Sequence, residues 1–288
     1  MKKYLIVFML GRVLNSCALN LEQRGYNFDN FKKTPVWNLA KAVRADDAEK
    51  VTKILKNEKL EIDFKDPEYQ QTLLALSIHN DKKNAFLALL KAGANPNLLL
   101  GNPANATPLI YGIENTMSLE RVSNCDLFYV KSMLQFGADP NLEIKNPQPE
   151  YTFYNSFPLL VAIHANTARV NECLDLIKLL VDSGADINCC YRQPDSEICE
   201  GVLAVALSGN SMEILKYFVI EKKIAIPDTV SIIGGLDKST QEAFSLREIL
   251  TSKYYKYEDF ESETGKHDRS QMRKTRDEIL EYLDKVGK

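Results

Sequence analysis

Apolar residues in the central part of the chain recur at the spacing of helices with one buried face. In "NAFLALL" (84–90) they stand at Phe86, Leu89 and Leu90, the i, i+3, i+4 pattern of an amphipathic helix. The run is followed at once by "KAGANPN" (91–97), which is rich in residues that do not continue a helix. Nearly the same phrase returns as "FGADPN" (136–141) and "SGADIN" (183–188). The pattern therefore predicts several helices that end in the same way.

The glycine of each phrase predicts the point where a helix stops. Glycine adopts the left-handed backbone conformation without a Cβ clash, and it commonly follows the last residues of a helix. Gly93, Gly137 and Gly184 are therefore expected at helix C-termini. The alanine that follows each glycine leaves room for close packing, and the final asparagine can bond neighbouring backbone groups within a turn.

A matching start signal lies upstream of these stops. "TPL" (107–109) supplies Thr107 as a hydroxyl N-cap and Pro108 at the first helical position. "TLL" (72–74) and "FPL" (157–159) are weaker copies of it. Each start is followed by a short helix, a turn, a second helix and the glycine stop. The sequence therefore predicts a series of helical hairpins.

Together these signals resemble ankyrin repeats, units of about 33 residues that begin with the phrase T-P-L-H-x-A. The distance from start to glycine is 21 residues between Thr72 and Gly93, as the family pattern expects, but 30 and 27 residues in the next two repeats. We expect these extra residues in the connection between the paired helices. The resemblance implies an all-α fold, an ankyrin-repeat solenoid of stacked helix-turn-helix units with finger loops, in which neighbours share one core.

The flanking segments are more degenerate copies of the same unit. "LAKAVRADDAEKVTKILKN" (39–57) has the two-helix rhythm without a glycine stop, and "VLAVALSGNSMEILKYFV" (202–219) fits a fifth repeat. "SLREIL" (245–250) and "DEILEYLDKVG" (277–287) fit a sixth. We expect an ankyrin repeat domain over residues 34–288, with six repeats at 34–68, 69–104, 105–153, 154–199, 200–240 and 241–288.

The N-terminus has the pattern of a secretory signal peptide. Lys2 and Lys3 precede the apolar run "YLIVFML", and "LNSC" (14–17) follows. The run is shorter than the ~20 residues that span a bilayer. "LNSC" resembles a bacterial lipobox, which implies a signal peptide over 1–16, a lipidated Cys17 and a linker over 17–33.

The residue after the lipobox cysteine bears on localisation. Ala18 at this position resembles lipoproteins sent to the outer membrane, which implies a lipid anchor on its periplasmic side. Arg12 interrupts the apolar segment and departs from the lipobox pattern. The alternative is a soluble chain whose first helix is apolar and whose Cys17 is unmodified.

Charge and composition exclude one class of partner. The chain has 288 residues, of which 45% are hydrophobic, enough to bury a sizeable core. Removal of residues 1–16 leaves 33 basic against 39 acidic residues, a net charge of −6. A mildly acidic chain with mixed surface charge does not favour phosphate backbones, so no nucleic acid partner is expected.

Five cysteines remain after Cys17. An odd number with no C-x-x-C pair argues against a structural zinc site and a complete disulfide framework. In an oxidising compartment Cys199 could close a short loop with Cys189 or Cys190. Cys125 and Cys173 are expected to be small core residues or free thiols.

The sequence contains no recognisable catalytic motif. It lacks the P-loop phrase, the G-x-S-x-G elbow and H-E-x-x-H, so neither catalysis nor a cofactor is expected. His79 and His164 hold equivalent positions in the first helices of repeats two and four. Since repeat three lies between them, we expect contact residues on the inner face and no metal site. Asp46 and Asp47 are expected at a helix–helix turn, where carboxylates cap a helix start.

The resemblance implies a protein-binding scaffold that uses its finger loops and inner helix faces. The loop "NPQPEYTFYNSF" (146–157) combines two prolines with large aromatic rings, the side chains typical of interface hot spots. The alternative is that these rings cover the edge of the array's own core. The next finger, "CCYRQPDSE" (189–197), offers two more candidates. The expected partner-binding residues are Tyr151, Phe153, Tyr154, Tyr191, Arg192, His79 and His164.

The leading hypothesis is a monomeric envelope lipoprotein whose array captures an unidentified protein. The chain resembles small bacterial ankyrin lipoproteins that act as immunity proteins, which implies occlusion of a toxin by the loop aromatics, aided by charge complementarity. The alternative is an accessory or assembly factor for a periplasmic oxidative-stress enzyme. A redox-sensitive Cys189, Cys190 or Cys199 would favour that alternative.

Overall fold

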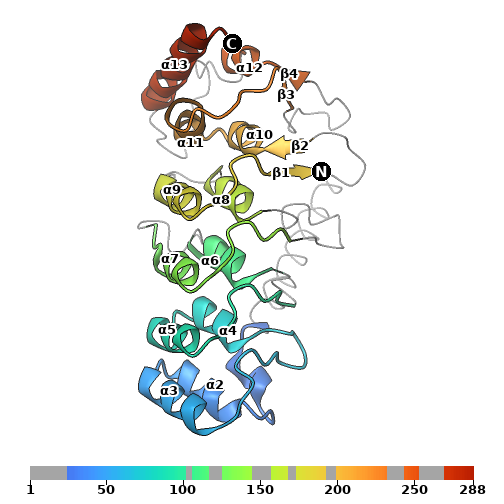
Figure 1. Cartoon of the computed structure of the whole chain (residues 1–288), viewed down its shortest axis with the longest axis vertical. Coiled ribbons are helices and arrows are strands. Elements are labelled where there is room, and N and C mark those ends of the chain that lie inside the picture. The colour runs from blue at the N-terminus through green and yellow to red at the C-terminus, as the bar shows by residue number, and fades with distance from the viewer. Residues whose placement is uncertain are drawn as a thin grey trace, which may run out of the picture. The chain divides into compact units, whose positions relative to one another are not determined.

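The computed structural model describes residues 25–101, 106–116, 125–144, 157–167, 173–192, 199–231, 243–252 and 269–288. These residues form helical hairpins of the ankyrin type, which confirms the predicted fold class (Figure 1). The chain divides into two compact bodies. The N-terminal body comprises Met1–Asn115 with Phe128–Asp139, and the C-terminal body comprises Thr116–Leu127 with Pro140–Lys288.

The N-terminal body is built from paired helices. Its described elements are the 3-10 turn η1 (Phe28–Phe31), the pair α2 (Trp37–Arg44) and α3 (Ala48–Asn57), the pair α4 (Leu73–His79) and α5 (Lys83–Lys91), and the pair α6 (Pro108–Thr116) and α7 (Phe128–Gln135). Helix α2 packs on α4, and α5 packs on both α3 and α7. The first helices of the pairs therefore form one side of this body and the second helices the other (Figure 1).

The C-terminal body continues the pattern and adds two short antiparallel ribbons. Its described elements are α8 (Pro158–Thr167), α9 (Leu174–Asp182), β1 (Cys190–Arg192), β2 (Cys199–Gly201), α10 (Val202–Ser208), α11 (Met212–Lys216), the π-helical turn η4 (Tyr217–Glu221), β3 (Val230–Ser231), β4 (Ala243–Phe244), α12 (Leu246–Thr251) and α13 (Arg269–Val286). Strand β1 pairs with β2, and β3 with β4. Helix α8 packs on α10, and α11 packs on α9 and α13. Each of the six expected repeat ranges holds one described helix pair, while the boundaries between repeats stay predictions.

The predicted helix starts are confirmed. The hydroxyl of Thr72 accepts a hydrogen bond from the Ala75 N–H, and that of Thr107 accepts one from the Ile110 N–H, both at 3.3 Å. Pro108 is the first residue of α6.

The two carboxylates expected at a helix–helix turn cap two different helices. Asp47 accepts from the Lys50 N–H at the start of α3 at 2.9 Å. Asp46 accepts from the Ala85 N–H of α5 at 2.8 Å. The Asp46 bond therefore joins one hairpin to the next.

The three glycine stops also have the predicted conformation. Gly93, Gly137 and Gly184 have φ values of 95°, 87° and 92°. In each case the N–H of the following alanine donates to the carbonyl five residues earlier, as in Ala138 to Met133 at 2.9 Å. This bond closes the helix end and lets the chain leave at a sharp angle.

The fifth hairpin closes its second helix without a glycine. Lys223 takes the left-handed position with φ 52°. The N–H of Ile224 donates to the carbonyl of Phe218, six residues earlier, at 3.1 Å. The extra residue is absorbed by the π-helical turn η4, because a π-helix holds one more residue per hydrogen-bonded ring than an α-helix.

The final asparagines of the first two phrases, Asn97 and Asn141, bond the turn of the next repeat. Asn97 donates through Nδ2 to the carbonyl of Gly137 at 2.9 Å, and its Oδ1 accepts from the Asp139 N–H at 2.7 Å. Asn141 makes the same pair of bonds to Gly184, at 2.8 Å, and to Asp186, at 2.7 Å. One amide thus satisfies both a carbonyl and an N–H of the neighbouring turn.

The folded part begins before the expected repeat boundary at residue 34. Tyr26, Phe28 and Phe31 are 5%, 4% and 0% exposed, and η1 packs on α2. The second half of the expected linker over 17–33 is therefore part of the N-terminal body. The signal peptide, Cys17 and the first part of the linker lie outside the described residues.

Two disulfides correct and complete the cysteine predictions. Cys125 is bonded to Cys173, so the expectation of free thiols or simple core residues at these positions is wrong. Cys190 is bonded to Cys199, which decides between the two pairings left open, and Cys189 is a buried free thiol. The first pairing could not be inferred because its partners stand 48 residues apart in sequence.

The left-handed turns predict a complementary pair of substitutions. Gly137→Val should lower the free energy of unfolding by about 1–2 kcal/mol, because a side chain at positive φ is strained although no atom lies within 4 Å of the added Cβ. Lys223→Gly should raise it by about 0.5–1 kcal/mol, since the relief of strain exceeds the added entropy of the unfolded chain. Urea denaturation measures both changes.

The neighbouring Lys222 is the matched control for the second substitution. Its φ is −86°, so Lys222→Gly relieves no strain and should destabilise the chain. Equal effects of Lys222→Gly and Lys223→Gly, or an unchanged stability of Gly137→Val, would contradict the role assigned to these turns.

Candidate interaction surface

The N-terminal body carries a stack of three rings, contributed by the N-terminal segment, the end of α4 and the middle of α6. The ring of Tyr26 stacks on the imidazole of His79 with centroids 4.2 Å apart, and on the ring of Tyr111 at 5.1 Å, with planes inclined by 18° in both cases. The hydroxyl of Tyr111 lies 2.6 Å from His79 Nδ1. His79 is exposed, as expected. The two contacts with Tyr26 and Tyr111 hold its ring in one orientation.

Amide side chains fix the backbone around this stack. Asn80 donates through Nδ2 to the carbonyl of Tyr26 at 3.1 Å and to that of Leu76 at 2.9 Å. Asn115 donates to the carbonyl of Ile78 at 3.3 Å. These bonds attach the N-terminal segment to the first helices. The buried rings of Tyr26 and Tyr111 thus support His79, which is the exposed member of the stack.

A buried carboxylate organises the loop between the first two hairpins. Asp66 is 0% exposed and accepts from the N–H groups of Glu68, Tyr69 and Gln71 at 3.0, 2.7 and 2.7 Å. The next loop is hydrogen-bonded to this one, because the Gly101 N–H donates to the carbonyl of Gln70 at 3.0 Å. Successive loops of the N-terminal body are thus bonded side by side.

In the C-terminal body His164 is exposed on α8, as expected for a contact residue. Nearby atoms nevertheless remove water from its imidazole, and this desolvation lowers its pKa below the ordinary value of 6.5. Among the described residues, no group of three or more His, Cys, Asp or Glu side chains could hold a metal ion.

The predicted finger of repeats four and five is a disulfide-closed ribbon. Tyr191 pairs with Glu200, and the Cys190–Cys199 disulfide joins the two strands. Tyr191 is half-buried, and its hydroxyl is enclosed with no hydrogen-bond partner among the described residues. The ring therefore does not project freely into solvent, although its proposed contact with a partner stays a prediction. Arg192 lies in β1.

The aromatic loop singled out by the sequence lies outside the described residues. This applies to Tyr151, Phe153 and Tyr154. Their role in binding stays a prediction. The structure instead adds Tyr26 and Tyr111, which the sequence analysis did not select. The one available signal was a tyrosine in the apolar face of the first helix of repeat three, directly after "TPLI".

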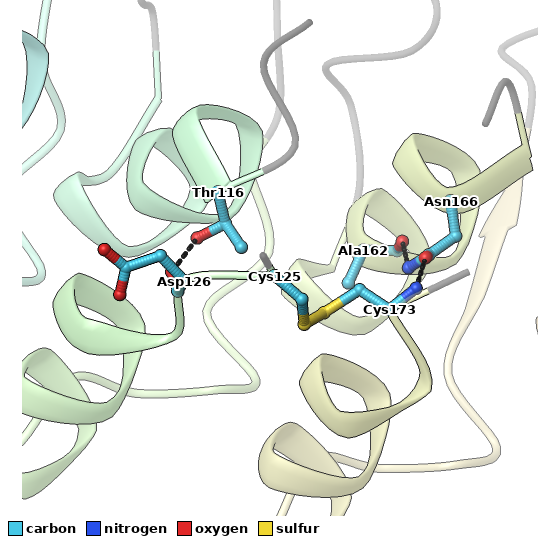
Figure 2. Close-up of a disulfide and its surroundings, with 6 residues drawn as sticks. All are labelled: Thr116, Cys125, Asp126, Ala162, Asn166 and Cys173. Atoms are coloured by element: carbon cyan, nitrogen blue, oxygen red, sulfur yellow. Dashed lines mark hydrogen bonds between the residues drawn. A yellow bond between two sulfur atoms is a disulfide. The ribbon is translucent and has the colours of Figure 1, made fainter. Parts of the chain in front are cut away.

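The Cys125–Cys173 disulfide lies at the opposite end of the helices from the finger loops. Figure 2 shows Cys125, just before α7, bonded to Cys173, which precedes α9. Asn166 donates to the Ala162 carbonyl at 2.8 Å and accepts from the Cys173 N–H (Figure 2). Thr116 donates to the Asp126 carbonyl at 3.2 Å. These bonds fix the ends of the two long connections. The prediction that all the extra residues lie between paired helices is correct only in part, because α6 and α8 have 9 and 10 residues against 7 in α4 and so take up some of the added length.

Comparisons with known proteins found likenesses of fold only. No family model matches the chain, and no curated protein matches it. The chain is similar to the crystal structure of EF0377, an ankyrin repeat protein, with 22% identity over 67% of this chain and 85% of that one, at a TM-score of 0.46. It is also similar to the human ASB11 ankyrin repeat domain, with 16% identity over 67% and 71%, at a TM-score of 0.43. The assignment of the fold rests on the turns and bonds described above.

One further property concerns membranes. Within the described part of the chain, no helix combines the length and the apolar character that crossing a bilayer requires.

The disulfides predict a loss of stability confined to variants in which a cross-link is removed. Replacing both Cys125 and Cys173 by alanine should cost about 4 kcal/mol from loop-closure entropy over 48 residues, and replacing Cys190 and Cys199 about 2–3 kcal/mol over 9 residues. Hydrogen exchange of the α9 amides reports the first loss. Cys189→Ala removes a thiol but no cross-link, and a loss of protection as large as in the double variants would contradict the assignment.

The environment of His164 predicts a pH-dependent stability. Because its pKa is depressed in the folded chain, its neutral form contributes stability above the unfolded pKa of about 6.5, and this contribution is lost as the pH falls through the folded pKa. His164→Gln should flatten that part of the stability profile. Imidazole NMR titration checks the cause, and a folded pKa of 6.5 or above would contradict it.

Proposed function

We propose that the chain is a non-catalytic protein-binding scaffold of the bacterial cell envelope. The observation that carries the proposal is the bonding of successive left-handed turns by Asn97 and Asn141. A loop held at its base loses little conformational freedom on binding, so more of the contact energy remains for affinity. Repeated turns that are held in this way suit the capture of another polypeptide.

The cysteine chemistry supports a location outside the reducing cytosol. Disulfides persist in oxidising compartments such as the periplasm, and four of the five cysteines after Cys17 are bonded in pairs. This agrees with the signal peptide and lipobox inferred from the sequence. We therefore propose a lipid anchor at Cys17 on the periplasmic side of the outer membrane. The anchored protein is a monomer whose repeats bind the partner.

The finer proposal is an immunity protein that occludes a cognate toxin. In this function Tyr151, Phe153 and Tyr154 enter the toxin's cleft, and Tyr191 and Arg192 contact it from the next finger. The net charge of the mature chain, −6, would help to attract a basic active site. The support for this finer proposal comes from the sequence resemblance and from the braced loops.

The alternative is an accessory or assembly factor for a periplasmic oxidative-stress enzyme. A reactive thiol would favour it, but burial, with a smaller contribution from the Asp186 charge, raises the pKa of the Cys189 thiol to about 12. Very little of it is thiolate at neutral pH, so Cys189 is a poor nucleophile. An accessory role without thiol exchange is compatible with the same scaffold.

Capture from native envelopes tests the proposed function. The full chain, tagged and expressed at its natural level, should retain one protein through a salt wash, and Tyr154→Ala should lower its yield at least about tenfold if the ring is a hot spot. Co-purification followed by mass spectrometry measures this.

Phe136→Ala is the matched control, because Phe136 is an exposed aromatic side chain that lies beyond α7 and outside the finger loops. Equal losses with both variants, or the absence of any protein dependent on the tagged chain, would refute the proposal.

A further inference from the structure

We propose that a hollow in the N-terminal body binds the carboxylate of an acidic segment in the protein partner. The proposal rests on the protein-binding function proposed above and specifies the chemistry of the partner. The hollow has a volume of about 410 Å³ and lies between the N-terminal segment, the end of α2 and the end of α4. It includes His79, which the sequence had selected as a contact residue, together with cations that it had not.

Positive charge enters the hollow from two different elements. Arg44 is the last residue of α2, and Lys82 precedes α5. None of the described residues that line the hollow is acidic. Two permanent cations facing one small space create a local positive potential on a chain that is acidic as a whole.

The existing ion pair of Arg44 does not block this role. Its Nη1 lies 3.3 Å from Asp29 Oδ1, and both side chains are exposed, by 50% and 41%. The other oxygen of Asp29 binds Lys32 at 2.8 Å. An exposed pair of this length contributes about 0–1 kcal/mol, so an incoming carboxylate can replace it, and the planar guanidinium can hold that carboxylate with two parallel hydrogen bonds.

The neutral groups of the hollow are already oriented. The Tyr111 contact and the Tyr26 stack hold the ring of His79, and two backbone carbonyls hold the amide of Asn80. Binding therefore needs little ordering of the protein. Tyr26 and Phe28, which also line the hollow, are only 5% and 4% exposed and support it from beneath.

This combination favours a peptide over a lipid surface. Membrane headgroups are attracted by clusters of several lysines and arginines on an accessible face, whereas this site has two cations in a small hollow. A glutamate or aspartate side chain fits such a site, because its carboxylate can meet both cations. An acidic peptide segment is thus the expected ligand.

The test uses the full chain and the peptide acetyl-Glu-Phe-Glu-amide as the probe. The imidazole NMR signal of His79 should shift saturably with peptide, while that of His164, in the C-terminal body, stays in place. Arg44→Gln and Lys82→Gln should each weaken binding about threefold or more, the effect of losing one partly exposed ion pair. Asp29→Asn should strengthen it, since it removes the competing carboxylate.

Matched controls change the same charge outside the hollow. Lys41→Gln and Lys83→Gln alter lysines that lie over the rings of Trp37 and Phe128, at 5.7 and 5.0 Å, and should leave the affinity unchanged. An equal response to acetyl-Gln-Phe-Gln-amide, or equal weakening by the controls, would overturn the proposal. So would a His79 response to inorganic phosphate or phosphatidylglycerol vesicles in the absence of any response to the acidic peptide.

This experiment can fail independently of the proposed function. It measures a small peptide on the N-terminal body, whereas capture of a partner from envelopes is measured with the intact chain and with Tyr154→Ala. A partner that is captured normally by Arg44→Gln and Lys82→Gln, combined with no peptide shift, would remove the carboxylate site and leave the scaffold function in place.

Discussion

The structure depends on the way one left-handed turn is tied to the next. A helix end exposes carbonyls and N–H groups that need partners. Asn97 supplies one of each to the turn at Gly137, and Asn141 does the same at Gly184. An amide is suited to this because it both donates and accepts, whereas Asp63, which only accepts from the Asn95 N–H, makes half of the arrangement. These bonds, together with the packing of the helices, link neighbouring hairpins within each body.

Departures from the regular repeat are absorbed locally, without loss of the hairpin. The fifth repeat has an extra residue before its stop, and a π-helical turn accommodates it while Phe218 remains fully buried. The longer connection of the fourth repeat is closed by Asn166 and by the disulfide of Cys173. The packing of the buried core is thus preserved, because the irregular residues are accommodated at the ends of the helices.

The same rigidity makes the surface usable. Side chains that would otherwise move are held by neighbours, as His79 is by Tyr111 and Tyr26. Preorganised polar groups on loops and helix ends can contribute most of their interaction energy to binding. Two disulfides, one at a finger and one at the opposite helix ends, further constrain this arrangement.

The sequence by itself determined the hairpins, their capped starts at Thr72 and Thr107 and their left-handed stops, because these depend on residues within one turn of each other. Only the tertiary structure decided the Cys125–Cys173 pairing, the left-handed Lys223, and the ring stack that joins Tyr26 to residues 53 and 85 positions later. Those features depend on which distant segments meet when hairpins stack. A local pattern states that a helix ends, but not which side chain from another repeat lies against that end.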